Sequence, residues 1–276
     1  MTAIRLSEWL LAGLMALAFV PAGIALVGVW SSVDYYSHGF LVPLVAYWAA
    51  TRGRSRFALA AERDRRGIAL AAFAACVYAV GLGSDSVSLQ GLSLVALAAA
   101  CTLYLGGVAG LRVLAFPLVF LVFMVPLPAD WLTPAIVGLQ LMVSSAAVEL
   151  MSWFGSGVVR YGNVIELPAG DSLFVAEACS GITSLVTLTP LAVMLAYFTE
   201  PTLRRQVAMV IAVVPVAMLG NLLRVATTVA YAERYGAERA TGNWLHESAG
   251  LITFGLACLG LIGLGALMRQ LSSART

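Results

Sequence analysis

The sequence of 276 residues contains little charge, and this shortage excludes a water-soluble fold. Only 11% of its residues are charged, whereas soluble domains carry about 25%. Apolar residues make up 61% of the chain, and its mean hydropathy is +0.93. We therefore predict an all-α, polytopic membrane protein embedded in a lipid bilayer. The net charge of +2 comes from basic residues gathered in loops, which indicates no nucleic-acid partner.

Cysteine and histidine are scarce, which excludes a disulfide framework and the usual metal-binding patterns. The chain has four cysteines and two histidines without CxxC or His-rich spacing, so we expect no metal and no cofactor. Cys76, Cys101 and Cys258 lie inside apolar runs and are interpreted as small hydrophobic residues. The apolar run Trp9–Trp30 is too long for a signal peptide and is interpreted as a retained first span.

Apolar runs long enough to cross a bilayer recur along the chain. An apolar helix needs about 20 residues to cross, with a range of about 17–25. The expected spans are 8–30, 36–50, 67–83, 88–107, 110–127, 179–199, 206–230 and 247–268. A further apolar helix over 131–152 carries polar residues, which favour an interfacial or re-entrant helix. No long linker or repeat divides the chain, so we expect one domain over residues 1–276.

Arginines in the connecting segments predict the topology, because basic residues are enriched on the cytoplasmic side of membrane proteins. The segment 51–66 holds six arginines, and others occur at Arg112, at Arg204 and Arg205, and in the tail from Arg269. All of these lie on the cytoplasmic side only if 131–152 does not cross. We therefore predict eight spans with both termini in the cytoplasm.

Residues 158–176 predict a small external β-hairpin. Val158–Leu167 and Ser172–Val175 are rich in branched and aromatic residues and flank the turn 168–171, Pro-Ala-Gly-Asp. Unpaired strands do not face lipid, so this hairpin is expected on the outer face of the membrane.

Three reactive side chains fall near the external ends of consecutive spans. Cys179 stands at the start of 179–199, with Ser180 as a candidate cap, and His246 precedes 247–268. Arg224 lies about two helical turns inside the external end of 206–230. The three side chains therefore share one depth near the outer leaflet. A helix N-terminus or a neighbouring cation favours the reactive thiolate form of a cysteine.

Each of these residues has a structural interpretation beside a catalytic one. Cys179 alone is more often structural, and Arg224 can instead snorkel or pair with Glu177 or Glu149. Together, a cysteine–histidine pair is the usual arrangement for thiol activation, and a guanidinium can stabilise the developing oxyanion. Further participants left open are His38, Glu177, Asn221, Asn243 and Glu247.

The segments around these residues resemble the exosortase/archaeosortase family of membrane cysteine transpeptidases. The resemblance rests on EACSGI around Cys179, NLLR ending at Arg224 and the segment around His246, with YSHGFLVP and FMVPLP in support. It implies that Cys179, Arg224 and His246 are the catalytic residues. Archaeal members have arginine at the third position, so His246 is similar to the bacterial pattern.

The resemblance also implies a substrate and a location. Substrates would be exported proteins whose C-terminal tail has a short motif such as Pro-Glu-Pro, a membrane helix and a basic cluster. Cleavage would occur on the external side of the bacterial inner membrane, and the thioester on Cys179 would pass to an unknown amine acceptor or to water. The alternative function is a transporter or polysaccharide-export component in which Arg224 lines a solute path. A structural scaffold, the third class, leaves the three residues unexplained.

Overall fold

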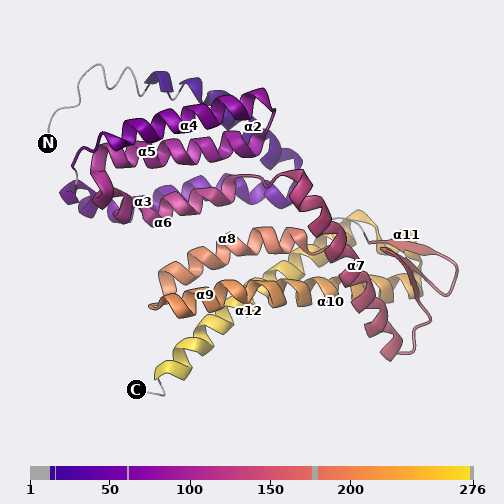
Figure 1. Cartoon of the computed structure of the whole chain (residues 1–276). Helices are drawn as coiled ribbons and strands as arrows, with labels where there is room; N and C mark the ends of the chain where they lie inside the picture. The colour runs from indigo at the N-terminus through magenta and orange to yellow at the C-terminus, as the bar shows by residue number, and fades with distance from the viewer. Residues whose placement is uncertain (1–12, 16, 61, 176–179, 274–276) are drawn as a thin grey trace. The chain divides into compact units, whose positions relative to one another are not determined.

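Long apolar helices make up most of the chain, as the composition predicts (Figure 1). The structure, a computed structural model, describes residues 13–15, 17–60, 62–175 and 180–273. By their internal contacts these residues divide into two units, Met1–Pro128 and Ala129–Thr276. Whether both units act as one domain over 1–276 stays a prediction.

The first unit is a set of apolar helices with two short 3₁₀ segments. Its elements are α2 (Val20–Ser32), η1 (Asp34–Phe40), α3 (Leu41–Ala60), α4 (Arg66–Gly83), α5 (Val87–Val113), α6 (Ala115–Phe120) and η2 (Leu121–Met124). Helices α4 and α5 pack against each other as a helical hairpin. Ser86 caps α5 by accepting a hydrogen bond from the N–H of Leu89 at 3.3 Å, as short hydroxyl side chains commonly do.

One expected boundary in the first unit is wrong and another is confirmed. The segment 51–66 is expected to be a loop, but α3 continues through Ala60 and leaves only a short connection before Arg66. The expected end of the span 88–107 coincides with a break in the long helix α5, and the expected span 110–127 consists of the end of α5, the short α6 and η2. Gly107, with φ +59° and ψ −164°, marks a break inside α5. Glycine adopts this conformation without the steric cost that a Cβ would add.

The second unit contains the segments in which the reactive residues were predicted. Its elements are α7 (Ala129–Trp153), β1 (Val159–Tyr161), β2 (Val164–Glu166), β3 (Ser172–Phe174), α8 (Ile182–Thr199), α9 (Leu203–Ile211), α10 (Val213–Tyr235), α11 (Ala237–Ala240) and α12 (Asn243–Ser273). Helix α10 contacts α7, α8 and α12, so it is the central helix of this unit.

Six of the described helical segments are long and apolar enough to cross a membrane. They are Arg66–Gly83, Val87–Val113, Ala129–Trp153, Ile182–Thr199, Leu203–Tyr235 and Ser248–Gln270. The expected count of eight spans is not confirmed. Helix α3 carries three arginines near its end, and α2 has only 13 residues. By length and composition α7 qualifies as a span, so its expected failure to cross stays a prediction.

The hairpin expected over 158–176 is confirmed, and it is part of a larger sheet. Strands β2 and β3 pair antiparallel on either side of the predicted turn 168–171, with Ile165 opposite Leu173. A third strand, β1, pairs with β2 through a tight Gly162-Asn163 connection. Gly162 has φ +64°, and type II′ hairpins place glycine at this first turn position. This glycine–asparagine pair divides the single strand expected over Val158–Leu167.

Helix α10 bridges two apolar cores. Near its start, Val213 and Ala217 pack with Leu188 of α8 and Leu261 of α12. Towards its end, Val229 packs against α7 and the inner face of the sheet. Asn221 and Arg224 lie along the stretch of α10 that packs in this second core, beside Met218, Leu222 and Val225, and burial of apolar surface fixes their position along the helix.

An ion pair joins the far ends of α8 and α12. Glu200, whose side chain is fully buried, contacts Arg269 with 2.6 Å between Oε1 and Nη1. The starts of α8 and α12 are the ends near the predicted residues Cys179 and His246. The ion pair joins the opposite ends of the two helices. A buried carboxylate without its cationic partner is costly, so this pair sets the register of one helix against the other.

Candidate functional site

The predicted catalytic residues differ in how far the structure describes them. Arg224 lies in α10, and its side chain is half-buried. His246 lies in the first turn of α12, but its side chain is outside the described part of the structure, as are those of Asn243 and Glu247. Cys179 and Glu177 lie outside the described residues altogether. The geometry of the site therefore comes from the residues next to them.

The start of α8 is a glycine turn behind a buried serine. Ser180 is fully buried, and its Oγ accepts a hydrogen bond from the N–H of Ile182 at 3.2 Å. Gly181, with φ +89°, is the N-cap residue, and α8 begins at Ile182. The cap expected at Ser180 is thus one residue off, although the Ser180 hydroxyl still satisfies an amide of the first turn.

Asn221 brings α10 against this turn. Its side chain is 3% exposed, and a Cβ placed on Gly181 would lie 3.3 Å from its Nδ2. The amide therefore occupies the space beside Gly181 that a side chain at this position would need. Gly181, the residue beside this amide, follows Cys179 by two residues in the sequence.

Arg224 connects the same face of α10 to α12. A Cβ placed on Gly250 would lie 3.4 Å from the Cζ of Arg224 and 3.5 Å from its Nη2. Because Gly250 has no side chain, the guanidinium can lie close beside α12. Gly250 follows His246 by four residues, so both lie on one face of the helix, one turn apart. Asn221 and Arg224, three residues apart on α10, likewise share a face.

A second anchor holds the chain just before the undescribed residues. Val175 directly follows strand β3, and its carbonyl accepts a hydrogen bond from the buried Gln140 of α7 at 3.2 Å. The N–H of Val175 donates to the carbonyl of Asn163 at 2.9 Å. Val175 and Ser180, the described residues that flank 176–179 in the sequence, are therefore both fixed by hydrogen bonds. Gln140 is one of the polar residues that favour an interfacial helix over 131–152, and no sequence motif indicates this contact.

We predict that Gly181→Ala destabilises the second unit and lowers activity. A positive φ costs a residue with a Cβ about 1–2 kcal/mol, and the new methyl group would press on Asn221. The melting temperature of the detergent-purified protein should fall. Gly138→Ala is the matched control, because nothing lies within 4 Å of its Cβ position in α7. This control should leave stability unchanged or slightly raised. Equal melting temperatures for both variants would contradict the strained turn.

His38, left open as a participant, has a structural position in the first unit. Its Nδ1 lies 3.0 Å from the carbonyl of Tyr35, and its Nε2 lies 3.1 Å from the carbonyl of Phe123. The ring thus connects η1 to η2. Nearby, the indole N–H of Trp30 donates to the carbonyl of Met124 at 2.9 Å, and Tyr36 Oη accepts from Leu127 N–H at 2.7 Å. These hydrogen bonds connect the YSHGFLVP segment to the FMVPLP segment, so the two segments pack together in the first unit.

The other cysteines and the acidic residues do not form a metal site in the described part of the chain. No group of three His, Cys, Asp or Glu side chains is close enough there to hold an ion. Cys76 and Cys101 are exposed on apolar helices, and Cys258 is half-buried in α12. All three lie on apolar helices, and their interpretation as small hydrophobic residues stays a prediction.

Comparison with known proteins identifies the family. A family model described as transmembrane exosortase (Exosortase_EpsH) matches residues 30–263. The match covers both units and contains Cys179, Arg224 and His246. Neither the curated proteins nor the solved structures that were searched gave a match. With its apolar helices, the chain is a multi-pass membrane protein that belongs to the transmembrane exosortase family.

Proposed function

We propose that this exosortase is a cysteine transpeptidase or protease that cleaves C-terminal sorting tails of exported proteins through a thioester on Cys179. One observation carries most of the proposal. Helix α10 touches the start of α8 through Asn221 and touches α12, one turn from His246, through Arg224. The three segments that bear the predicted catalytic residues thus meet along one face of α10.

In the proposed reaction the Cys179 thiolate attacks a peptide carbonyl of the substrate tail. A carbon–sulfur bond forms, and the carbonyl oxygen gains negative charge, which the Arg224 guanidinium stabilises. His246 takes the thiol proton and returns it to the leaving amine as the carbon–nitrogen bond breaks. An amine acceptor or water then attacks the thioester, which transfers the acyl group and restores the thiol. The tail is the partner of this site, and the acceptor is an amine of unknown identity.

The surroundings of Arg224 support a functional role. A charged side chain inside a membrane segment is costly and marks a functional position by default. The guanidinium lies beside Gly250, which contributes no side chain there, and the residue is half-buried. A half-buried cation at this position is compatible with contact to a substrate carbonyl.

We further propose that the site faces outward from the bacterial inner membrane and that both termini are cytoplasmic. A membrane-impermeant maleimide added to intact spheroplasts should label Cys179 in a variant in which the other three cysteines are alanine. A second variant has all four native cysteines replaced by alanine and carries Ser273→Cys as its single thiol. It should label only after permeabilisation. Labelling of Cys179 only after permeabilisation would overturn the proposed topology.

Trapping the acyl-enzyme tests the chemistry directly. The purified chain is mixed with a protein carrying a Pro-Glu-Pro tail, a membrane helix and a basic cluster, and is quenched in acid. Mass spectrometry should find the substrate acyl group on the peptide that contains Cys179, and hydroxylamine should release it. Cleavage of the substrate without any such adduct, under conditions in which the second step is slowed by removing amines, would argue against a thioester.

A further inference from the structure

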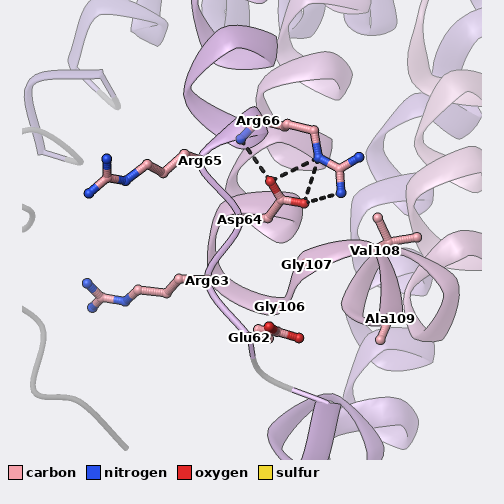
Figure 2. A pocket seen from close by; sticks show the side chains of 9 residues that line it. All are labelled: Glu62, Arg63, Asp64, Arg65, Arg66, Gly106, Gly107, Val108 and Ala109. Atoms are coloured by element: carbon pink, nitrogen blue, oxygen red, sulfur yellow. Dashed lines mark hydrogen bonds and ion pairs between the residues drawn. The ribbon is translucent and has the colours of Figure 1, made fainter.

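The charged side chains around a hollow in the first unit do not point to one place. The hollow lies between the α3–α4 connection and the middle of α5 and has a volume of about 310 Å³. Figure 2 shows that Arg63 and Arg65 extend away from α5, whereas Arg66 pairs with Asp64, with 2.6 Å between Nη2 and Oδ2. The residues described there present no shared set of ligands. The second unit, in contrast, exposes an apolar surface on its sheet.

Both faces of this sheet carry apolar side chains. On the inner face, Ile165 and Leu173 stand opposite each other and are 0% and 5% exposed. One position along, Tyr161, Val164 and Phe174 form a row across the three strands. Because side chains alternate between the faces of a strand, this row lies on the outer face, where Tyr161 and Phe174 are 64% and 63% exposed. An antiparallel sheet with one packed face usually shows polar residues to water on the other. The apolar row therefore indicates a surface that is not simply aqueous.

The inner face fixes the sheet beside the ends of two long apolar helices. Met151, near the end of α7, and Ala232, near the end of α10, belong to the same core as the inner face. Figure 1 shows the strands next to α11 and the end of α10. The segments Ala129–Trp153 and Leu203–Tyr235 are both long and apolar enough to cross a membrane. Helices of this kind end in or just beyond the headgroup region, so the sheet lies at the depth of the membrane interface.

Polar contacts at this level fit the interface and not the hydrocarbon centre. The Ser156 hydroxyl donates to the carboxylate of Glu233 and so joins the segment after α7 to the last turns of α10. A carboxylate is costly at the bilayer centre. On β1, next to the apolar row, the exposed Arg160 donates from Nη1 to the carbonyl of Gly162 at 2.8 Å. A basic side chain beside aromatic ones is typical of protein surfaces that lie on anionic lipid.

Further aromatic side chains gather at the same end of the unit. Trp153 and Phe154, where α7 ends, are 75% and 80% exposed. The rings of Tyr231 and Tyr235, in the last turns of α10, lie 4.5 Å apart between centroids, and Tyr235 is exposed. Tryptophan and tyrosine are enriched at membrane–water interfaces, because each combines an apolar ring with a polar group. The ends of α7 and α10 and the outer row of the sheet therefore share one aromatic level.

We propose that the outer face of the sheet lies on the lipid bilayer, with Tyr161 and Phe174 at the boundary between headgroups and acyl chains. The same face is polar at its other end, where Glu166 and Ser172 stand opposite each other and are exposed, and this end stays in water. Lipid is the partner because the two helices hold the sheet at interface depth. The contact does not depend on the proposed peptidase activity.

Spin labelling of the full chain in vesicles of phosphatidylcholine and phosphatidylglycerol tests the proposal. The four native cysteines are replaced by alanine, and a single cysteine is introduced as Phe174→Cys or, as the matched control, as Ala169→Cys. Ala169 lies in the exposed turn at the polar end of the sheet. Access of oxygen and of a water-soluble nickel chelate gives the depth of each label. The label at Phe174→Cys should lie about 5–10 Å inside the interface, as the apolar faces of interfacial helices do, whereas the label at Ala169→Cys should lie in water.

Tyr161→Cys, in the same row on another strand, gives a second position, so the result does not depend on one variant. Circular dichroism should show the same helical content in all three variants, because each replaced side chain is exposed. Equal access of the nickel chelate to the row and to Ala169→Cys would place the outer face in water and overturn the proposal. Shielding of the row from both reagents would show that protein covers it, which would overturn the lipid contact as well. Because Cys179 is absent from this background, neither result depends on whether the chain is a transpeptidase.

Discussion

Cys179→Ala is expected to reduce processing of a tail-bearing substrate by at least about 10³-fold, because it removes the only atom in the proposed mechanism that bonds to the substrate. Precursor and product are followed by immunoblot in cells that express the chain together with the substrate. The variant should still accumulate to normal levels, since the loss of one thiol removes little buried surface.

Cys258→Ala is the matched control for this experiment. Cys258 is a half-buried thiol on α12, and it has no place in the proposed reaction. Its variant should process the substrate at nearly the wild-type rate. Cys179→Ser adds a second measurement, because a hydroxyl preserves size but not thiolate chemistry. Unchanged processing in Cys179→Ala would contradict the thiol mechanism and would favour the transporter alternative.

Arg224 is expected to show the second-largest effect. Arg224→Ala should lower the rate of the acylation step by about 10²–10³-fold, the usual loss when a donor to a developing oxyanion is removed. Arg224→Lys keeps the charge but loses the planar fork, so we expect it to lose about tenfold. Single-turnover kinetics with purified protein and substrate measure this step separately from product release.

Stability distinguishes catalysis from a structural role at this position. If Arg224 only pairs with an acidic residue, its removal leaves a buried carboxylate and lowers the melting temperature. If it serves the reaction, removing a costly membrane cation leaves stability equal or higher while activity falls. Arg234→Gln, an exposed position near the end of the same helix, controls for the loss of one charge. A parallel fall in melting temperature and activity in Arg224→Ala alone would contradict the catalytic role.

Some of the fold was predictable because a bilayer imposes simple requirements on a sequence. Helices 67–83, 131–152 and 179–199 were expected within a few residues of α4, α7 and α8, since apolar length alone specifies a buried helix. The β2–β3 hairpin was predictable from its Pro-Ala-Gly-Asp turn. The predicted break after residue 107 agrees with the non-helical Gly107, whereas the predicted end of the second span failed because α3 continues through charged residues from Arg52 to Arg56.

The sequence by itself determined that this is a membrane protein of the exosortase type, and it nominated Cys179, Arg224 and His246. Those inferences depend on composition and on local motifs, which need no partner segments. Only the tertiary structure decided that Asn221 lies beside Gly181 and that Arg224 lies beside Gly250. Contacts between helices depend on which helix faces pack together. Glycine has no apolar side chain, so the sequence pattern does not reveal that these contacts form at Gly181 and Gly250. The arrangement of α8, α10 and α12 around one polar face is therefore a property of their packing.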